Sequence, residues 1–237
     1  MDRISQTHMD NLEQIADTIR EEMEAMNDAR DDALARSREL IRHCAGTIKA
    51  IHREQWDEAR TGLQTARQAA SELSAGVAGY PDLYHSGYTQ DALKEYVEAY
   101  ATFALVRGEP LPTPADLDVP GSTYLNGLCE AASELRRAIL DIIRHEHNDV
   151  AEDLLDKMDG VYNMLMTFDF PDAITYGLRR RVDSLRGVTE RTRGDLTNSM
   201  RQQRLQEALH QLEQQLGLTA EVSMPEISLD DDDQDAD

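Results

Sequence analysis

One apolar stripe with helical spacing continues from residue 4 to residue 52 and constrains the fold more than any other feature of the sequence. Apolar residues recur there three or four positions apart, while Glu, Asp and Arg occupy most of the other positions. The stripe comprises Leu12, Ile15, Ile19, Met23, Met26, Leu40, Ile41, Cys44, Ile48 and Ile51. This period predicts one long amphipathic helix or a pair of helices, because a half-buried strand repeats every two residues.

The rest of the chain continues the helical pattern in segments that glycine and proline separate. We expect helices at about 53–73, at about 89–107 with Thr89 as N-cap, at about 122–145 with Ser122 as N-cap, at about 149–168, and from Pro171 to Leu216, where Gly217 stops the last one. Four prolines prevent a continuous helix over 108–121, which we interpret as a stiff connector.

These segments predict an all-α fold of six or seven helices. We expect one domain over residues 1–217 and an acidic, disordered tail over residues 218–237. Several helices are longer than a compact monomer needs, so we expect faces left over for an oligomer.

The chain is strongly acidic, and almost all of its basic residues are arginines. Asp and Glu number 46 against 24 Lys and Arg, which gives a net charge of −22, and only Lys49, Lys94 and Lys157 are lysines. Such a surface is typical of proteins from high-salt cytoplasms, where salt screens the self-repulsion of a large net charge. We therefore expect a halophilic source, and an acidic surface for a basic partner is the alternative.

Composition also limits where the chain can function. No apolar run approaches the ~18 residues that a membrane span needs. The first residues lead into an acidic amphipathic stretch rather than a signal peptide. Cys44 and Cys129 form no disulfide framework and fall on apolar stripes, so we expect buried structural thiols in a cytoplasmic protein.

Two carboxylate pairs are the main candidates for chemistry. Glu95 and Glu98 are three residues apart, and Glu130 and Glu134 are four apart, so each pair lies on one helical face. On two antiparallel helices, the four carboxylates would form a hard-oxygen site suited to Mg²⁺ or Mn²⁺. The alternative is coincidence, because 46 acids produce many such spacings by chance.

Other candidates are weaker. His145 and His147 are two residues apart and so point to different faces of a helix, which makes a shared metal improbable there. The sequence contains no glycine-rich phosphate loop, no GxSxG elbow, no HExxH and no paired CxxC motif.

Three segments, taken in order along the chain, resemble hallmarks of the translin superfamily. Tyr84-His85, then Leu93-Lys94-Glu95-Tyr96-Val97-Glu98-Ala99, is similar to a segment of translin-associated factor X that reads phenylalanine-histidine, then leucine-glutamine-glutamate-tyrosine-valine-glutamate-alanine. Tyr124-Leu125-Asn126-Gly127, followed by Glu130 and Glu134-Leu135, resembles the family's tyrosine-leucine-x-glycine, acid, glutamate-leucine hallmark. Leu178-Arg179-Arg180-Arg181-Val182-Asp183-Ser184-Leu185 resembles the basic start of its last long helix.

The resemblance to an archaeal-type member implies an octameric shell that binds single-stranded RNA or DNA. The factor X branch is a metal-dependent endoribonuclease, and its catalytic and metal-binding carboxylates fall on Glu95, Glu98, Glu130 and Glu134. Position 130 is glutamate where the factor usually has aspartate. The translin branch binds single-stranded nucleic acid without the full carboxylate set, so a non-catalytic shell is the alternative.

A run of arginines could offset the acidic charge toward RNA. Arg179, Arg180, Arg181, Arg186, Arg191 and Arg193, followed by Arg201 and Arg204, lie in a stretch with few acids. We interpret the first six as a phosphate-binding strip, and a solvated helix face that balances nearby acids is the alternative. An all-α, Mg²⁺-dependent nucleotide pyrophosphohydrolase also uses clustered helical acids and is a further alternative, although it needs no such strip.

Overall fold

The computed structural model describes residues 2–144 and 148–216, and these residues form nine helices and no strand. The helices are α1 (Asp2–His52), α2 (Trp56–Gly76), α3 (Pro81–Tyr84), α4 (Gly87–Arg107), α5 (Pro114–Leu117), α6 (Gly121–Ile143), α7 (Asn148–Leu165), α8 (Asp172–Thr175) and α9 (Leu178–Gln215). The predicted all-α class is confirmed, with six long helices and three single turns. The predicted tail and the two histidines at 145 and 147 lie outside the described residues.

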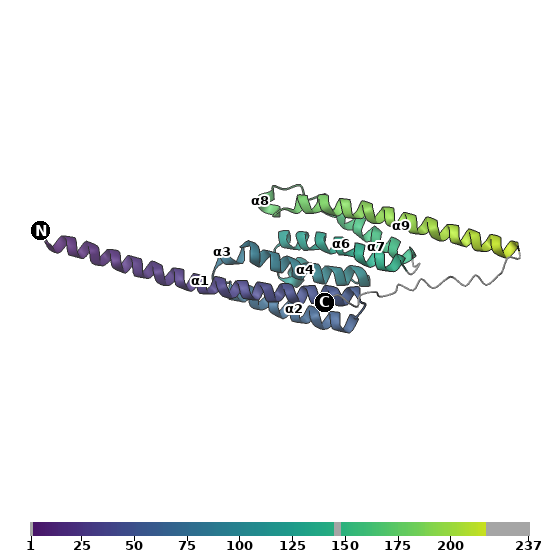
Figure 1. Cartoon of the computed structure of the whole chain (residues 1–237). Helices are drawn as coiled ribbons and strands as arrows, with labels where there is room; N and C mark the ends of the chain where they lie inside the picture. The colour runs from purple at the N-terminus through teal and green to yellow at the C-terminus, as the bar shows by residue number, and fades with distance from the viewer. Residues whose placement is uncertain (1, 145–147, 217–237) are drawn as a thin grey trace, which may run out of the picture.

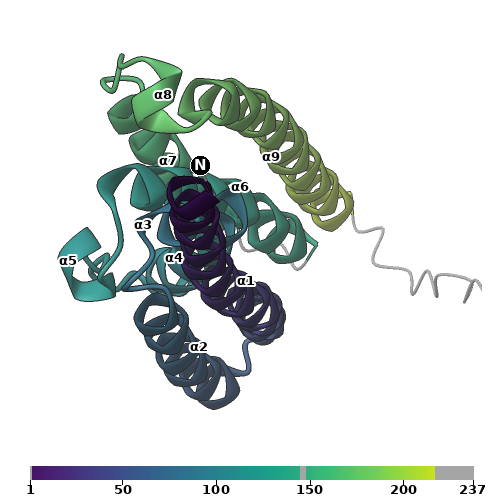
Figure 2. The ribbon, with the colours of Figure 1, turned by 90° about the vertical axis from the view of Figure 1, so that its left-hand side faces the viewer.

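The long helices pack in layers around α4. Helix α1 contacts α2 and α4, α4 contacts α6, and α6 contacts α7 and α9. Seen along the bundle, α2 lies on one side and α9 on the other (Figure 2). Helix α4 is buried on nearly every face, so the charged residues Lys94 and Glu98 lie inside the protein.

Helices α4 and α6 run parallel, and the expectation of an antiparallel pair is wrong. Thr123 of α6 bonds Gln90 of α4, and further along both helices Glu130 contacts Lys94, so residue numbers rise together. The connector between the helices makes this possible, because its 13 residues can span about 43 Å, whereas α4 is about 31 Å long. Arg67 donates to the Asp116 carbonyl at 3.0 Å and fixes this returning segment.

The first predicted helix is one continuous element, but two predicted N-caps are wrong. Helix α4 begins at Gly87 after Ser86, and α6 begins at Gly121 after Pro120. The Thr89 hydroxyl instead donates to the Leu83 carbonyl oxygen at 2.8 Å, which ties α4 to the single turn of α3.

The long helix predicted from Pro171 is interrupted. Tyr176 and Gly177 both adopt left-handed φ angles, 51° and 84°, and a helix cannot continue through two such residues. The Gly177 amide donates to Asp172 Oδ1 at 2.6 Å, and Asn126 Nδ2 of α6 donates to the Thr175 carbonyl at 2.8 Å. The break is therefore held by α6, and α9 begins only at Leu178.

Two helices extend beyond the bundle at opposite ends (Figure 1). Most of the apolar stripe of α1 is buried from Ala33 onward, with Ile41 as an exposed member, whereas its earlier part is exposed throughout, and the C-terminal part of α9 carries a second exposed stripe. We call these the projecting stripes. They consist of Leu12, Ile15, Ile19, Met23 and Met26 on α1, and of Leu205, Leu209, Leu212 and Leu216 on α9. The described residues contain no helical segment that combines the length and the hydropathy of a membrane span.

Candidate metal centre

Three of the four predicted carboxylates meet in the interface between α4 and α6. Glu95, Glu98 and Glu130 each offer an oxygen, and these oxygens all lie within 4.8 Å of one another. Glu134 is not part of the group. Because α4 and α6 are parallel, Glu134 lies about 6 Å further along the helix axis than Glu130, beyond the level of Glu98.

Gly127 lets the two helices approach closely at this point. A Cβ atom there would lie 2.6 Å from Val97 Cβ and 2.7 Å from the Lys94 carbonyl oxygen, well inside van der Waals contact. Any larger residue would push α6 away from α4. The glycine in the segment Tyr124–Gly127 therefore has a packing role, which is to bring the carboxylates of the two helices together.

Two cations hold Glu130. Lys94 Nζ donates to Glu130 Oε2 and, at 2.8 Å, to Glu95 Oε1, while Arg181 Nε donates to Glu130 Oε1 at 2.9 Å. Burial raises the pKa of the Glu130 carboxyl, but the hydrogen bonds from Lys94 and Arg181 outweigh it and hold the pKa below its usual value. Glu130 is therefore ionised at neutral pH.

Glu98 has the opposite environment. Only 7% of the residue is exposed, and within residues 11–144 and 149–216 no hydrogen bond or ion pair reaches its carboxylate. Burial, followed by the charges of Glu95 and Glu130, raises the pKa of Glu98 to about 8. The group thus contains one carboxylate with two cationic partners and one with none.

Glu134 instead pairs with a histidine of α1. His52 Nε2 lies 2.7 Å from Glu134 Oε2, and the His52 side chain is 2% exposed. The hydrogen bond from His52 holds the pKa of Glu134 below its usual value, so the carboxylate accepts and the Nε2 proton stays on the imidazole. His52 Nδ1 is buried without a hydrogen-bond partner in the described chain.

The arginine run does not form one strip. Arg181 turns inward, where Nη1 also donates to Asn126 Oδ1 at 3.1 Å and to the Tyr176 carbonyl at 3.0 Å. Arg193 Nη2 contacts both oxygens of Asp159 on α7, at 2.8 and 2.7 Å. Arg179, Arg180, Arg186 and Arg191 are exposed, and their spacing places them on two different sides of α9.

Three residues of the site lay outside the sequence-based candidates, namely His52, Lys94 and Asn126. Asn126 is buried and uses both amide atoms, because Nδ2 donates to the Thr175 carbonyl and Oδ1 accepts from Arg181. A signal existed for Lys94, which is one of only three lysines and stands within an apolar helical pattern. For His52 and Asn126 the sequence holds no comparable signal.

Both cysteines are buried, as predicted. Burial raises the pKa of the Cys129 thiol to about 12, and it raises the pKa of Cys44 further. Both thiols are therefore protonated and chemically inert at neutral pH.

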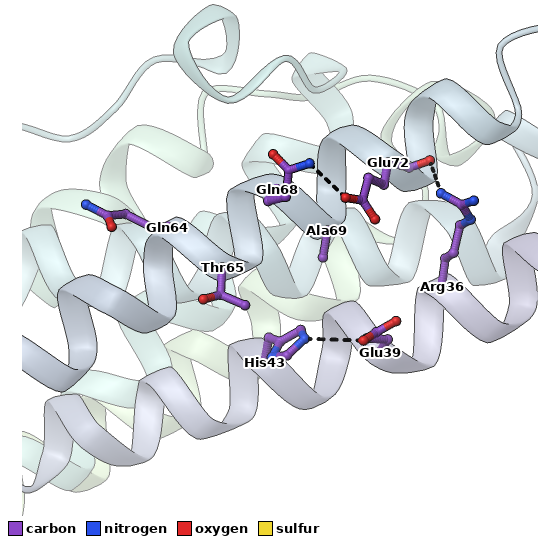
Figure 3. Close-up of a pocket in the computed structure, with 8 residues that line it drawn as sticks. All are labelled: Arg36, Glu39, His43, Gln64, Thr65, Gln68, Ala69 and Glu72. Carbon is purple, nitrogen blue, oxygen red and sulfur yellow. Dashed lines mark hydrogen bonds and ion pairs between the residues drawn. The ribbon is translucent and has the colours of Figure 1, made fainter.

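A separate polar cavity of about 430 Å³ lies between α1 and α2 (Figure 3). It is lined by Arg36, Glu39, His43, Gln64, Thr65, Gln68, Ala69 and Glu72 and contains none of the four predicted glutamates. Arg36 donates to the Glu72 carbonyl at 2.9 Å and Gln68 to the Glu72 carboxylate at 2.7 Å. Arg36, Gln68 and Glu72 thus bond one another, and the candidate metal-binding carboxylates lie elsewhere, in the α4–α6 interface.

Comparison with known proteins gives the family. No family model matches the chain. An uncharacterized protein of Methanocaldococcus jannaschii is 30% identical over 194 residues, which cover 81% of this chain and 85% of the relative. The crystal structure of AfC3PO and the structure of its complex with duplex RNA both match at 33% identity and a TM-score of 0.73, covering 78% of this chain and 96% of AfC3PO.

The fold recurs at lower identity in apo-NeC3PO, with a TM-score of 0.71 at 20% identity. AfC3PO is a translin-family protein. It is similar to this chain in both sequence and fold, over most of the length of both proteins. The chain therefore belongs to the translin superfamily.

Proposed function

We propose that this chain binds single-stranded RNA or DNA as a homo-oligomeric shell, an octamer by family resemblance, and cleaves RNA with Mg²⁺ or Mn²⁺. The observation that supports the catalytic part is the close approach of Glu95, Glu98 and Glu130. Glu98 is buried and has no hydrogen-bond partner in the described residues. RNA as the ligand is supported by the AfC3PO complex, whose RNA is a duplex. Both single-stranded and duplex RNA are therefore test substrates.

The three carboxylates suit a hard divalent cation. Mg²⁺ and Mn²⁺ prefer carboxylate oxygens, and opposite ligands of a Mg²⁺ ion lie about 4.2 Å apart. The oxygens here lie within 4.8 Å, so only a small inward movement is needed. A buried Glu98 without a hydrogen bond also fits, because a cation would compensate its charge.

The side chains divide into distinct roles. A bound divalent cation would supply Lewis acidity and lower the pKa of an attacking water. Glu95, Glu98 and Glu130 would hold it. Glu134 is oriented by His52 outside this group and is the candidate general base. Exposed Arg179, Arg180, Arg186 and Arg191 would contact phosphates, whereas Arg181 and Arg193 are engaged by Glu130 and Asp159.

Assembly is supported by the projecting stripes. The stripe of α1 is the same one that packs on α2 and α4 beyond Ala33, so its exposed part has the pattern of an interface. Exposed apolar patches of this extent mark sites of association. We assign a second copy of the chain as the partner, because both stripes are helical and each has the spacing that packs against another helix.

A non-catalytic shell is the second candidate function. It is favoured by the hydrogen bonds that Lys94 and Arg181 make to Glu130 and by the pairing of Glu134 with His52, since both engage carboxylates that cleavage requires. A nucleotide pyrophosphohydrolase gains no support from the relatives.

Incubation with labelled RNA in molar KCl separates these functions. The chain is mixed with single-stranded RNA, duplex RNA or nucleoside triphosphates, with Mg²⁺, Mn²⁺ or EDTA. We expect cleavage of single-stranded RNA only with a divalent cation, and a loss by orders of magnitude in Glu98→Gln. Glu152→Gln, on the exposed face of α7, is the matched control. RNA binding without cleavage would identify the non-catalytic shell, and hydrolysis of nucleotides alone would identify the pyrophosphohydrolase.

A further inference from the structure

Lys94 is a buried ammonium in the middle of the carboxylate group. The residue is 7% exposed, and its Nζ reaches Glu95 and Glu130 from within α4, one position before Glu95. A lysine is rarely buried to this extent unless its charge is compensated. Here two carboxylates provide the compensation.

The Lys94 ammonium donates hydrogen bonds to only two of the three carboxylates. Glu95 and Glu130 accept hydrogen bonds from Lys94, whereas Glu98 accepts none in the described chain, although one of its oxygens lies within 4.8 Å of an oxygen of each of the other two. The group therefore combines three carboxylates with one ammonium, that of Lys94. Arg181 neutralises only the far oxygen of Glu130 and is itself fixed by Asn126 and the Tyr176 carbonyl.

We propose that the Lys94 ammonium is the built-in cation of this site, and that a divalent cation binds only by displacing it from Glu95 and Glu130. This role for Lys94 rests on the metal function proposed above for the same carboxylates. It makes Lys94 the residue that sets the affinity of the site for divalent cations.

The physical basis is competition for the same oxygens. An ammonium within hydrogen-bond distance of Glu95 and Glu130 uses the oxygens that a divalent cation needs, and it repels that cation strongly at low dielectric. Lysine can withdraw, because its charge sits on a flexible four-carbon stem. Arg181 cannot do so as easily, since three separate acceptors hold its guanidinium.

The first test measures Mn²⁺ binding by calorimetry to the full chain. Lys94→Gln keeps a polar side chain but removes the charge, so we expect Mn²⁺ to bind at least about tenfold more tightly than to the parent. Lys157→Gln is the matched control, because Lys157 bonds the Leu105 carbonyl and Asp153 away from the site. Its Mn²⁺ affinity should equal that of the parent.

The second test uses the parent chain and needs no variant. Lys49, Lys94 and Lys157 are the only lysines, so acetylation of each is readily followed by mass spectrometry. Without divalent cations, we expect rapid labelling of exposed Lys49 and slow labelling of Lys94. Saturating Mn²⁺ should accelerate labelling of Lys94 severalfold and leave Lys49 unchanged. This measurement tests the displacement of Lys94 by Mn²⁺ even if Lys94→Gln does not fold.

The outcomes separate this role from the metal function itself. Equal or weaker Mn²⁺ binding by a folded Lys94→Gln, or protection of Lys94 that persists in saturating Mn²⁺, would overturn the displacement even if RNA is cleaved. Absence of Mn²⁺ binding in both the parent and Lys94→Gln would overturn the metal function together with it. Tighter binding by Lys94→Gln, with Lys94 released by Mn²⁺ in the parent, would establish the displacement.

Discussion

The α4–α6 interface and the projecting stripes depart from the usual distribution of residues in opposite directions. In the interface, Lys94 and Glu98 are charged residues that are each 7% exposed. On the projecting stripes, Met23 and Leu216 are apolar residues that are 68% and 62% exposed. Buried charges require partners nearby, whereas exposed apolar side chains are tolerated singly but rarely in a continuous stripe.

The two regions differ in whether the chain itself supplies partners for their unfavourably placed side chains. Lys94, Arg181 and His52 provide partners for the half-buried Glu95, Glu130 and Glu134 from within the chain, whereas the buried Glu98 has none among residues 11–144 and 149–216. Nothing in the described residues covers the projecting stripes. Substitutions in the interface should therefore change the stability of the single chain, and substitutions on the stripes should change its association.

The largest effect is expected from Gly127→Val, which forces α4 and α6 apart. The added Cβ alone would lie 2.6 to 2.8 Å from atoms of Val97 and the Lys94 carbonyl. We expect the free energy of unfolding to fall by about 3 kcal/mol or more in denaturant titrations, as for severe overpacking. Gly160→Ala, where a Cβ meets nothing within 4 Å, is the control and should be neutral or stabilising. A stable Gly127→Val would show that the helices do not depend on this close approach.

The second effect concerns association. Ile19→Asp combined with Met23→Asp places charges on the α1 stripe, and we expect loss of the oligomer with unchanged helix content. Light scattering in molar KCl measures the mass, and circular dichroism measures the helix content. Glu21→Gln with Asp28→Asn alters the opposite side of α1 and should leave the mass unchanged. An intact oligomer in the Ile19 and Met23 variant would exclude this stripe as an interface.

The third effect depends on pH and concerns Glu98, the carboxylate of the α4–α6 interface that has no cationic partner within hydrogen-bond distance. Glu98 has a pKa of about 8 in the folded chain against 4.5 ordinarily, so the folded state binds more protons between these values. Stability therefore falls as pH rises from about 4.5 to 8. We expect Glu98→Gln to be more stable than the parent by about 2 kcal/mol at pH 8.5 in EDTA, and equal to it near pH 4.5.

Thermal melts at both pH values measure this effect. Exposed Glu152→Gln should show no such pH-dependent gain. A constant difference between Glu98→Gln and the parent at the two pH values would contradict the raised pKa.

The smallest effect is expected from Glu134→Gln, which weakens the hydrogen bond from His52. Glu134 is partly exposed, so we expect a loss of only about 1 kcal/mol at pH 7. Because its pKa is lowered by His52, the carboxylate stabilises the fold above its ordinary pKa, and this contribution disappears as pH falls through the lowered value. Denaturation over a pH series from 7 downward should show the difference at pH 7 and its disappearance as acid protonates Glu134. A loss of RNA cleavage without loss of stability would favour the role of Glu134 as base.

The resemblance and the helical periods predicted much of this protein correctly. The apolar stripe to Ile51 predicted α1, the prolines of 108–121 predicted the connector, and the motif residues predicted the translin fold. Residue spacing identified Glu95 and Glu98 as neighbours, because residues three apart share a helical face.

Other features depended on contacts that no local pattern contains. The break at Tyr176–Gly177 is held by Asn126 from 49 residues away, and Arg181 is thereby turned from the expected strip into the carboxylate group. Periodicity predicts which face of a helix is apolar, but it carries no information about what another helix places opposite that face.

The sequence by itself determined most of the long helices, their apolar faces and the family. Only the tertiary structure decided that α4 and α6 run parallel, which follows from the length and anchoring of the connector rather than from either helix. The parallel arrangement aligns Glu130 with Lys94, Glu95 and Glu98, and it leaves Glu134 to His52. The reason is geometric: spacing within one helix determines which side chains share a face, whereas the direction and register between two helices determine which charges meet.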